Sequence, residues 1–223
     1  MADVVIIGAG PAGIFAAQEL AKHSDGLDIV IVEQGKDITE RSRTGRDMLI
    51  GWGGAGAFSD GKLTISTDVG GQLSSLLNED ELMGLLEEVD GIYTSHDFSG
   101  GLYSVEPDDA ARISARAKLA GLIYVPTKVR HIGTENCHTI LKRMRDELSS
   151  RVRVKFNTRA KDILKDGDRV TGVSLEDGTL VEARFVIAAP GRVGSSWMSE
   201  QAKRLGLQTV PYTPLTLPTI YPL

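Results

Sequence analysis

The chain of 223 residues has one cysteine, Cys137, which excludes an intrachain disulfide. Such sparing use of cysteine is typical of a reducing compartment. No apolar run approaches the roughly 20 residues that a membrane-spanning helix needs. Near the start, Asp3 stands where a secretory signal would carry positive charge. We therefore expect a cytoplasmic protein with no membrane span.

Positive charge is also limited. Against 30 Asp and Glu residues stand 25 Lys and Arg residues, so the net charge is −5, and the basic residues form no block. A surface that follows nucleic-acid phosphates is therefore not expected. His131 and His138 do not have the spacing of a metal pair on one helical turn, and no cysteine or acidic cluster accompanies them. We expect neither a nucleic-acid partner nor a metal site.

Glycine is abundant directly after the first apolar run. Val4–Ile7 predicts a buried strand, and the alanine-rich segment Ala12–Lys22 predicts a helix. Between them, Gly8 permits a tight turn, Gly10 lets a pyrophosphate approach the backbone, and Gly13 lets the helix pack closely on the sheet. The N-terminus of the helix would offer free N–H groups to the phosphates. This pattern predicts a dinucleotide-binding turn.

A second apolar strand, Leu27–Val32, ends at Glu33. Glu33 follows Gly13 by 33 − 13 = 20 residues, the position where an acidic side chain accepts hydrogen bonds from a ribose diol. A carboxylate there disfavours the 2′-phosphate of NADP, because like charges would meet. The alternative is an ordinary turn of an α/β protein with a solvated Glu33. The residues leave open whether the dinucleotide is FAD or NAD.

A second glycine-rich segment covers residues 47–62. Ordering so many glycines costs conformational entropy, which favours a loop whose backbone lies against a ligand. The large apolar residues Trp52 and Phe58 argue against a flexible surface loop. Ser59 and Lys62 are the polar residues best placed to meet a cofactor or substrate. Three arginines lie just upstream: Arg41, Arg43 and Arg46. They either bind phosphates or are simply solvated.

The middle of the chain predicts mainly helices. Their expected ranges are Glu79–Val89, Pro107–Leu119 and a helix capped by Thr134 that runs to Leu148, with a short strand at Leu122–Val125. Cys137 lies on the apolar stripe of the last helix, so we interpret it as a core residue and not as a nucleophile. His131, beside Arg130, either faces a substrate or flavin or is an ordinary loop histidine.

From Val152 the pattern changes to short strands. We expect a meander of four consecutive strands: Val152–Phe156, Arg159–Leu164, Arg169–Leu175 and Thr179–Ala189. The last of them ends in a buried stretch, Phe185–Ala189. The glycine turn at residues 190–194 would bring a second piece of backbone to the same cofactor. Ser195 or Ser196 would cap a final helix, which Gly206 ends.

These motifs together resemble a known family. The stretch GAGPAG, Glu33, the meander with GVSLEDG and the stretch VIAAPGRVG resemble the FAD-dependent oxidoreductases of the glutathione-reductase type. More narrowly, GWGGAGAFSDGKL, RHIGTE and APGRVGSSW are similar to a group of FAD-dependent dehydrogenases. The resemblance extends to about Leu207. It implies an α/β fold, with a Rossmann-like FAD-binding domain built from a parallel sheet, helices and a β-meander, that is incomplete at its C-terminal end.

The resemblance also implies a domain division. Residues 1–207 would form the FAD-binding domain, with a helical insertion at about residues 70–150. The proline-rich tail, residues 208–223, would stand where a substrate domain begins, so we expect a shortened form of a longer family member. Such a form would expose apolar surface, which favours self-association into a homo-oligomer.

The resemblance assigns FAD to a set of residues and implies an oxidoreductase of unknown substrate. The cofactor-binding residues would be Gly8, Gly10, Pro11, Ala12, Gly13, Glu33, Gln34, Gly53, Gly54, Ala55, Gly56, Ser59, Ala160, Ala189, Pro190 and Gly191. The partners would be a small-molecule substrate and NAD(P)H as electron donor. The alternatives are an NAD-binding dehydrogenase and a non-catalytic FAD-binding module. No residue identifies itself as a general acid or base.

Overall fold

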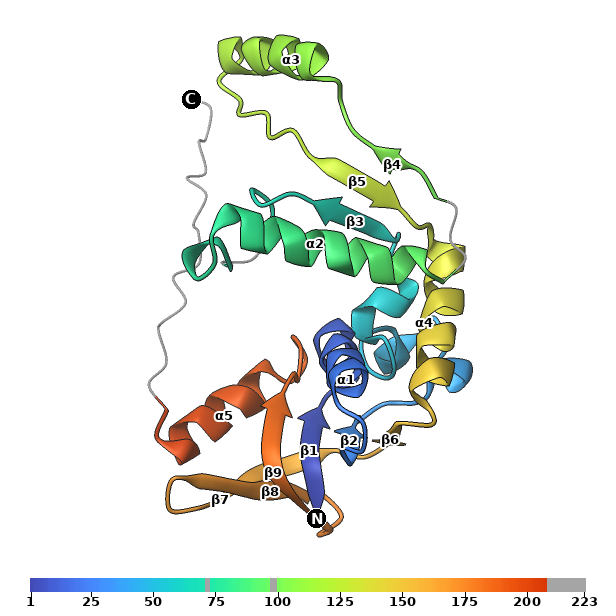
Figure 1. Cartoon of the computed structure of the whole chain (residues 1–223), viewed down its shortest axis with the longest axis vertical. Helices are drawn as coiled ribbons and strands as arrows, with labels where there is room; N and C mark the ends of the chain where they lie inside the picture. Colours follow the sequence, from blue (N-terminus) through green and yellow to red (C-terminus); the bar gives the residue numbers. More distant parts are fainter. Residues whose placement is uncertain (71–72, 97–99, 208–223) are drawn as a thin grey trace.

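The computed structural model describes residues 1–70, 73–96 and 100–207, so the expected tail at residues 208–223 lies outside the described residues. Six strands form the main sheet in the order β6-β2-β1-β9-β8-β7 (Figure 1). Their bounds are β1 (Ala2–Ile7), β2 (Ile29–Val32), β6 (Val152–Lys155), β7 (Ala160–Asp166), β8 (Arg169–Leu175) and β9 (Leu180–Ala188).

The centre of this sheet is parallel. β1 lies between β2 and β9, and Val5 pairs with Val30 on one side and with Val186 on the other. This confirms the first strand predicted from the sequence. The second strand begins two residues later than expected, at Ile29. All four β2 residues are buried, because both faces of the parallel region are covered.

The meander is confirmed for three of its four strands. β7, β8 and β9 are antiparallel neighbours, and β9 continues past β8 to pair with β1. The strand at Val152 is a correction, because β6 pairs parallel with β2 at the opposite edge of the sheet. It follows a helix that carries the chain back across the sheet, and such a crossover returns a parallel strand. The prediction that Phe185–Ala189 is a buried strand is wrong, because Phe185 is 60% exposed and none of the five residues is buried.

Five α-helices accompany the sheets in the described part of the chain: α1 (Pro11–His23), α2 (Glu79–Thr94), α3 (Pro107–Leu119), α4 (Thr134–Leu148) and α5 (Ser195–Leu205). Short 3₁₀ turns are η1 (Ile38–Glu40), η2 (Gly45–Met48), η3 (Gly54–Phe58) and η4 (Leu73–Ser75). No helix among the described residues has the length and apolar character to cross a membrane.

The helix ends differ from two expectations. The N-cap of α4 is Gly133, so Thr134 is the first helical residue and caps nothing with its side chain. Likewise Gly194, and neither Ser195 nor Ser196, is the N-cap of α5. In both cases the chain enters the helix from a glycine turn, which moves the boundary by one or two residues. The end of α5 is as predicted, because Gly206 adopts a left-handed conformation there.

A second, three-stranded antiparallel sheet lies apart from the main one, in the order β3-β5-β4 (Figure 1). It is made of β3 (Lys62–Ile65), β4 (Leu102–Tyr103) and β5 (Lys128–His131), so the segment expected to be a helical insertion also holds strands. The strand predicted at Leu122–Val125 does not form. Its Ile123 is 93% exposed, so no neighbour pairs with or covers this run.

Two apolar layers meet at the central strands, whose side chains alternate between the faces. On one face, Val4, Ile6 and Ile31 pack against residues of α1 and α4. On the other, Val5, Ile7 and Val32 pack against Val173 and Leu175 of β8 and against Trp197 of α5. Cys137 is buried in the first layer, which confirms its prediction as a core residue.

Candidate functional site

The turn between β1 and α1 has the close contacts that its glycines predict. Gly8 has a φ of +100°, and a Cβ there would overlap the carbonyl oxygen of Ala189. A Cβ on Gly13 would overlap the carbonyl oxygen of Gly8, so the helix lies directly on the turn. A Cβ on Gly10 would meet nothing within 4 Å. Gly8 and Gly13 therefore serve the fold, whereas the space beside Gly10 is open to a ligand.

A cavity of about 390 Å³, which we call the turn cavity, opens beside Gly10. Its volume lies in the range of small-molecule sites. Three glycine-rich segments line it, and they are far apart in the sequence. The lining residues are Gly8, Gly10, Pro11, Glu33, Gln34, Leu49, Ile50, Gly51, Gly54, Ala55, Gly56, Ala189, Pro190, Gly191, Arg192 and Val193. The structure thus brings together most of the sequence-predicted site.

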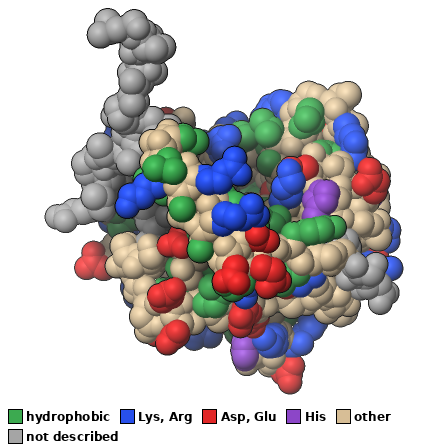
Figure 2. Space-filling model, turned by 90° about the horizontal axis from the view of Figure 1, so that it is seen from above, with side chains coloured by type: hydrophobic (Ala, Val, Ile, Leu, Met, Phe, Trp, Pro, Cys, Tyr) green, Lys and Arg blue, Asp and Glu red, His purple; other side chains and the backbone are tan. Residues whose placement is uncertain are grey.

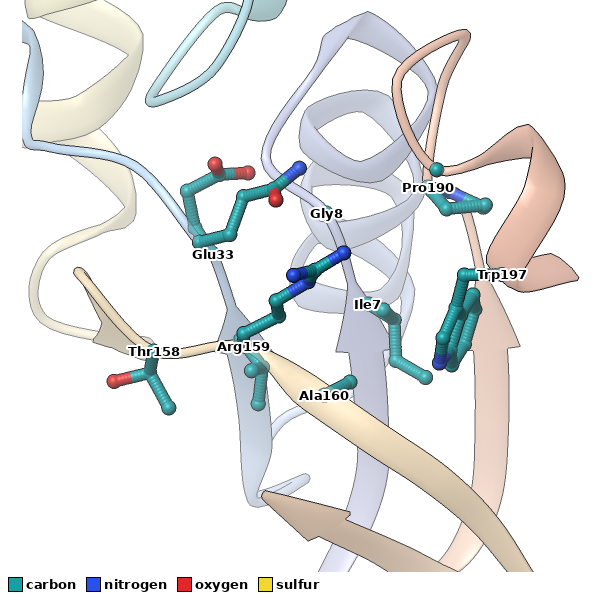
Figure 3. Close-up of a pocket in the computed structure, with 11 residues that line it drawn as sticks. Ile7, Gly8, Glu33, Thr158, Arg159, Ala160, Pro190 and Trp197 are labelled. Atoms are coloured by element: carbon teal, nitrogen blue, oxygen red, sulfur yellow. The ribbon is translucent and has the colours of Figure 1, made fainter. Parts of the chain in front are cut away.

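A smaller cavity of about 50 Å³, the strand cavity, continues from the turn cavity toward the start of β7. The two share Gly8, Glu33, Gln34 and Pro190. In Figure 3, Arg159 extends from the start of β7 toward the β1 end, and the Trp197 indole stands on the opposite side of Ile7. The indole N–H donates to the carbonyl of Lys161 at 2.7 Å, which fixes the ring against this cavity.

An outer cavity of about 440 Å³ adjoins both, beyond Gln34 and Ile50. Its rim carries charges of both signs. Lys36 pairs with Asp47 at 2.9 Å, and Arg159 pairs with Glu176 at 3.3 Å. On the face of the molecule seen in Figure 2, basic and acidic side chains also lie in neighbouring groups, with hydrophobic side chains between them.

The second glycine-rich segment is attached to the first by backbone hydrogen bonds. The N–H of Gly53 donates to the carbonyl of Ala9 at 2.7 Å, and the N–H of Trp52 donates to that of Lys36 at 3.0 Å. Trp52 is fully buried, and its indole N–H donates to the carbonyl of Leu141 in α4 at 2.8 Å. The tryptophan therefore anchors the segment, while Gly51, Gly54 and Gly56 line the turn cavity.

Arg41 has neither of the two roles considered from the sequence. It is only 8% exposed, and its guanidinium donates to the carbonyls of Asp47 and Trp52. Burial lowers the pKa of Arg41, while the charges of Glu33 and Asp47 oppose that shift. Arg41 thus holds the backbone of the glycine-rich segment. Arg43 lies over the Phe58 ring at 5.8 Å, and Arg46 lines the outer cavity.

Glu33 lies at the predicted site, and its carboxylate is hydrogen-bonded to backbone. Its side chain lines both inner cavities, but it is only 5% exposed. Its Oε2 accepts the N–H of Ala9 at 2.7 Å, and its Oε1 accepts the N–H groups of Gly35 at 2.8 Å and Gly51 at 2.9 Å. Both carboxylate oxygens are therefore already bonded to backbone.

Several predicted residues line none of these cavities. Ala12 and Gly13 lie in the first turn of α1, and Gly53 precedes η3. The Ser59 hydroxyl accepts the N–H of Gly61 and lies 3.9 Å from the Cys137 sulfur. Lys62 forms an ion pair with Asp60 at 2.8 Å. His131 is exposed at the end of β5, opposite Lys62 in the small sheet. No group of three metal-ligating side chains gathers within the described ranges.

Several cavity-lining residues were not named individually in the predicted site, although most lie in segments that were expected to approach the ligand: Leu49, Ile50, Thr158, Arg159, Arg192, Val193, Gly194 and Trp197. The stretch APGRVGSSW contained the signal for four of them, since its glycine turn was expected to approach the ligand. No sequence motif around Thr158 and Arg159 marks them as site residues. They reach the site because β7 begins beside the end of β2.

Comparisons with known proteins give a family match over nearly the whole chain. The FAD dependent oxidoreductase (DAO) family matches residues 3–218. An uncharacterized protein of Clostridium beijerinckii is 46% identical over 72 residues, or 27% of this chain and 13% of that protein. A monooxygenase of Claviceps purpurea is 27% identical over 195 residues, or 85% of this chain and 34% of that protein. The chain thus spans about a third or less of these relatives.

Among solved structures, the Diels-Alderase PyrE3 of pyrroindomycin biosynthesis matches with a TM-score of 0.52 at 19% identity. The match covers 91% of this chain and 35% of that one. At such identity the likeness concerns the fold, and it agrees with the mixed sheet described above.

Proposed function

Because the chain belongs to the FAD dependent oxidoreductase family, whose cofactor is FAD, we propose that its two joined inner cavities hold FAD. We further propose that the chain takes part in electron transfer between the flavin and a small-molecule substrate. The observation that carries the proposal is Gly10, whose missing side chain leaves open space in the turn cavity at the start of a 13-residue helix.

The turn cavity fits the pyrophosphate part of the cofactor. It lies at the N-terminus of α1, where free backbone N–H groups and the positive end of the helix dipole favour anions. Pro11 at the first helical position has no N–H, so the donors nearest the phosphates would come from Ala12 and Gly13. Gly54, Ala55 and Gly56 would approach from the second loop, and Ala189 to Gly191 from the third.

The adenosine part would lie across the mouth of the strand cavity, whose volume of about 50 Å³ is far below that of a complete ligand pocket. Ala160 and Trp197 contribute apolar surface there, and Gln34 and Thr158 contribute polar groups. A flat ring against an indole and a short side chain, with few polar contacts, is a common arrangement for purines. The resemblance already placed Ala160 among the cofactor-binding residues.

When bound, FAD supplies the electron-transfer chemistry, and the protein supplies binding and orientation. The residues described here would hold the dinucleotide, and three backbone segments would surround its pyrophosphate. No general acid or base is assigned to this chain. The proposal has four further parts. NAD(P)H is the electron donor, residues 1–207 form the FAD-binding domain, and the chain associates with itself. The location is cytoplasmic, which the single cysteine favours.

An NAD-binding dehydrogenase is disfavoured by the meander. After β6 the chain forms three antiparallel neighbours, whereas simple nicotinamide domains continue with alternating strands and helices. A non-catalytic FAD-binding module is the other alternative, and binding of FAD alone does not distinguish it from an oxidoreductase. Turnover must therefore be tested separately from binding.

The test is a titration of the cofactor-free protein with FAD, followed by flavin fluorescence and absorbance. We expect saturable binding to the wild type and at least a tenfold loss in Gly10→Val, because the valine would occupy the open space. Gly84→Val is the matched control, because Gly84 is an exposed residue of α2 with open space around it. Saturable binding of NAD without binding of FAD would contradict the proposal.

Turnover is then measured by anaerobic reduction of the bound flavin with NADH and with NADPH. Reduction by either nucleotide supports the oxidoreductase role and identifies the donor. Flavin that binds but is reduced by neither nucleotide, nor by small-molecule amine and alcohol donors, would favour the non-catalytic module.

A further inference from the structure

The glycine turn between β9 and α5, residues 190–194, contributes to the third wall of the turn cavity. The turn is anchored at its start, because the N–H of Ala189 donates to the carbonyl of Ile7 at 2.8 Å. It is also compact, since a Cβ on Gly194 would overlap Pro190. The tip of the turn is therefore held at a defined place beside the cavity.

The ends and the tip of this turn face different cavities. Pro190 and Gly194, at its ends, line the strand cavity, and in Figure 3 Pro190 stands beside the Trp197 indole. The tip residues line the turn cavity and not the strand cavity: Gly191, Arg192 and Val193. Because the adenosine is proposed to lie at the strand cavity, the tip stands at the phosphate part of the ligand.

The turn cavity needs positive charge if it is to hold a pyrophosphate. Glu33 lines the cavity with a carboxylate, and the phosphates would add further negative charge beside it. The N-terminus of α1 offsets only about half an elementary charge. Among the described residues that line this cavity, Arg192 has the one cationic side chain.

Three neighbouring cations are already bound within the protein. The buried Arg41 donates to backbone carbonyls of its own segment. Lys36 and Arg159 each form an ion pair with an acidic side chain of the outer cavity. Arg192 is exposed, and its side chain forms no hydrogen bond or ion pair within the described part of the chain. Its planar fork of N–H donors is thus available to a phosphate.

We propose that Arg192 binds the pyrophosphate of the cofactor and makes the site selective for a diphosphate over a monophosphate. Its guanidinium donates charge-assisted hydrogen bonds to the phosphate that is remote from the adenosine. A nucleotide whose single phosphate lies next to the adenosine lacks this contact. The inference rests on the proposed FAD site, because it assigns Arg192 a role within that site.

The test compares ADP with AMP in calorimetric titrations of the cofactor-free protein. We expect Arg192→Gln to bind ADP at least about tenfold more weakly than the wild type, because it loses the charge-assisted hydrogen bonds. Its affinity for AMP should stay within about threefold of the wild-type value, since that ligand lacks the second phosphate. Arg192→Lys should bind ADP with intermediate affinity, because lysine keeps the charge but not the planar fork.

Arg169→Gln is the matched control, since it removes the same charge from an exposed residue of β8 that lines none of the three cavities. It should leave the affinities for ADP and AMP unchanged. Both variants should keep the melting temperature of the cofactor-free wild type, because neither arginine is buried. A selective loss of ADP affinity at unchanged melting temperature therefore reports a lost contact and not a damaged fold.

An unchanged ADP affinity in Arg192→Gln overturns the inference, and so does an equal loss for ADP and AMP. If Arg192→Gln does not fold, the ratio of ADP affinity to AMP affinity in Arg192→Lys decides the question. A ratio below that of the wild type supports the inference, and an unchanged ratio overturns it. A wild type that binds neither FAD nor ADP would instead contradict the proposed function.

Discussion

The carbonyl oxygen of Gly8 occupies the place where a side chain on Gly13 would begin. This contact brings the first turn of α1 directly onto the end of β1, and it leaves room for glycine alone. Gly10, between them, has open space at the same position. The three glycines of one motif therefore have separable roles in folding and in binding.

Gly13→Ala should destabilise the fold by about 1–3 kcal/mol, because the added methyl must push the helix away from the turn. Gly84→Ala in α2, where a Cβ meets nothing, should be neutral or should stabilise by up to about 1 kcal/mol. Urea unfolding followed by circular dichroism measures both. Equal stability of the two variants would show that the close approach of Gly13 and Gly8 does not constrain the helix.

Tryptophan fluorescence should report occupancy of the strand cavity. The chain has two tryptophans, and only Trp197 lines a cavity, whereas Trp52 is fully buried in the core. Addition of ADP to cofactor-free protein should change the emission intensity, since the adenine would lie against the Trp197 ring. Trp197→Phe should abolish the change. If the variant responds like wild type, the adenine lies elsewhere.

The ion pair between Asp90 and Arg130 should contribute to stability, because it joins α2 to β5. The guanidinium contacts both carboxylate oxygens, and each side chain is only 15% exposed. This hydrogen bonding to Asp90 raises the pKa of Arg130. Asp90→Asn should cost about 2 kcal/mol in urea unfolding, since it leaves a largely buried cation without its partner.

The matched control for that pair is Asp109→Asn in α3. Asp109 and Arg112 also form an ion pair, at 2.7 Å, but their side chains are 56% and 67% exposed. Solvent screening should keep its effect below about 0.5 kcal/mol. Similar losses in the two variants would mean that burial does not strengthen the Asp90–Arg130 pair.

Cys137 should be unreactive and should make stability depend on pH. Burial raises the pKa of its thiol. Its contribution to stability is then fully present below the unfolded-state pKa of about 8.5, and is lost as pH rises toward the higher folded-state pKa. Unfolding free energy should therefore fall as the pH rises above about 8.5, and Cys137→Ala should show a flatter profile in this range.

The reaction of the thiol with Ellman's reagent gives an independent check. At pH near 8, the native protein should react at least about a hundredfold more slowly than the protein in urea, because the thiolate is both rare and shielded. Rapid reaction of the native protein would show that the apolar layer around Cys137 opens readily to solvent.

Local patterns predicted the elements whose signals are local. The strand at Val4–Ile7, the helix Pro107–Leu119 and the three antiparallel strands after Ala160 follow from β-branched runs, a first-turn proline and glycine turns. The small sheet was missed because its strands are short and charged, and they pair across more than 60 residues between Lys62 and His131. The strand expected at Leu122–Val125 does not form, although its local pattern is apolar. It has no partner strand with which to form a hydrogen-bonded ladder.

The amino-acid sequence by itself determined the kind of protein this is: a strand, a glycine turn and a helix for a dinucleotide, followed by a meander that favours FAD. Only the tertiary structure decided which backbone groups the polar side chains near this site bind. From the sequence we expected Glu33 to bind a ribose, and we considered phosphate binding or solvation for Arg41. In the fold both are bonded to backbone groups, because segments far apart in the chain converge there with donors and acceptors that must be satisfied. Such partners are non-local, so no spacing in the sequence reveals them.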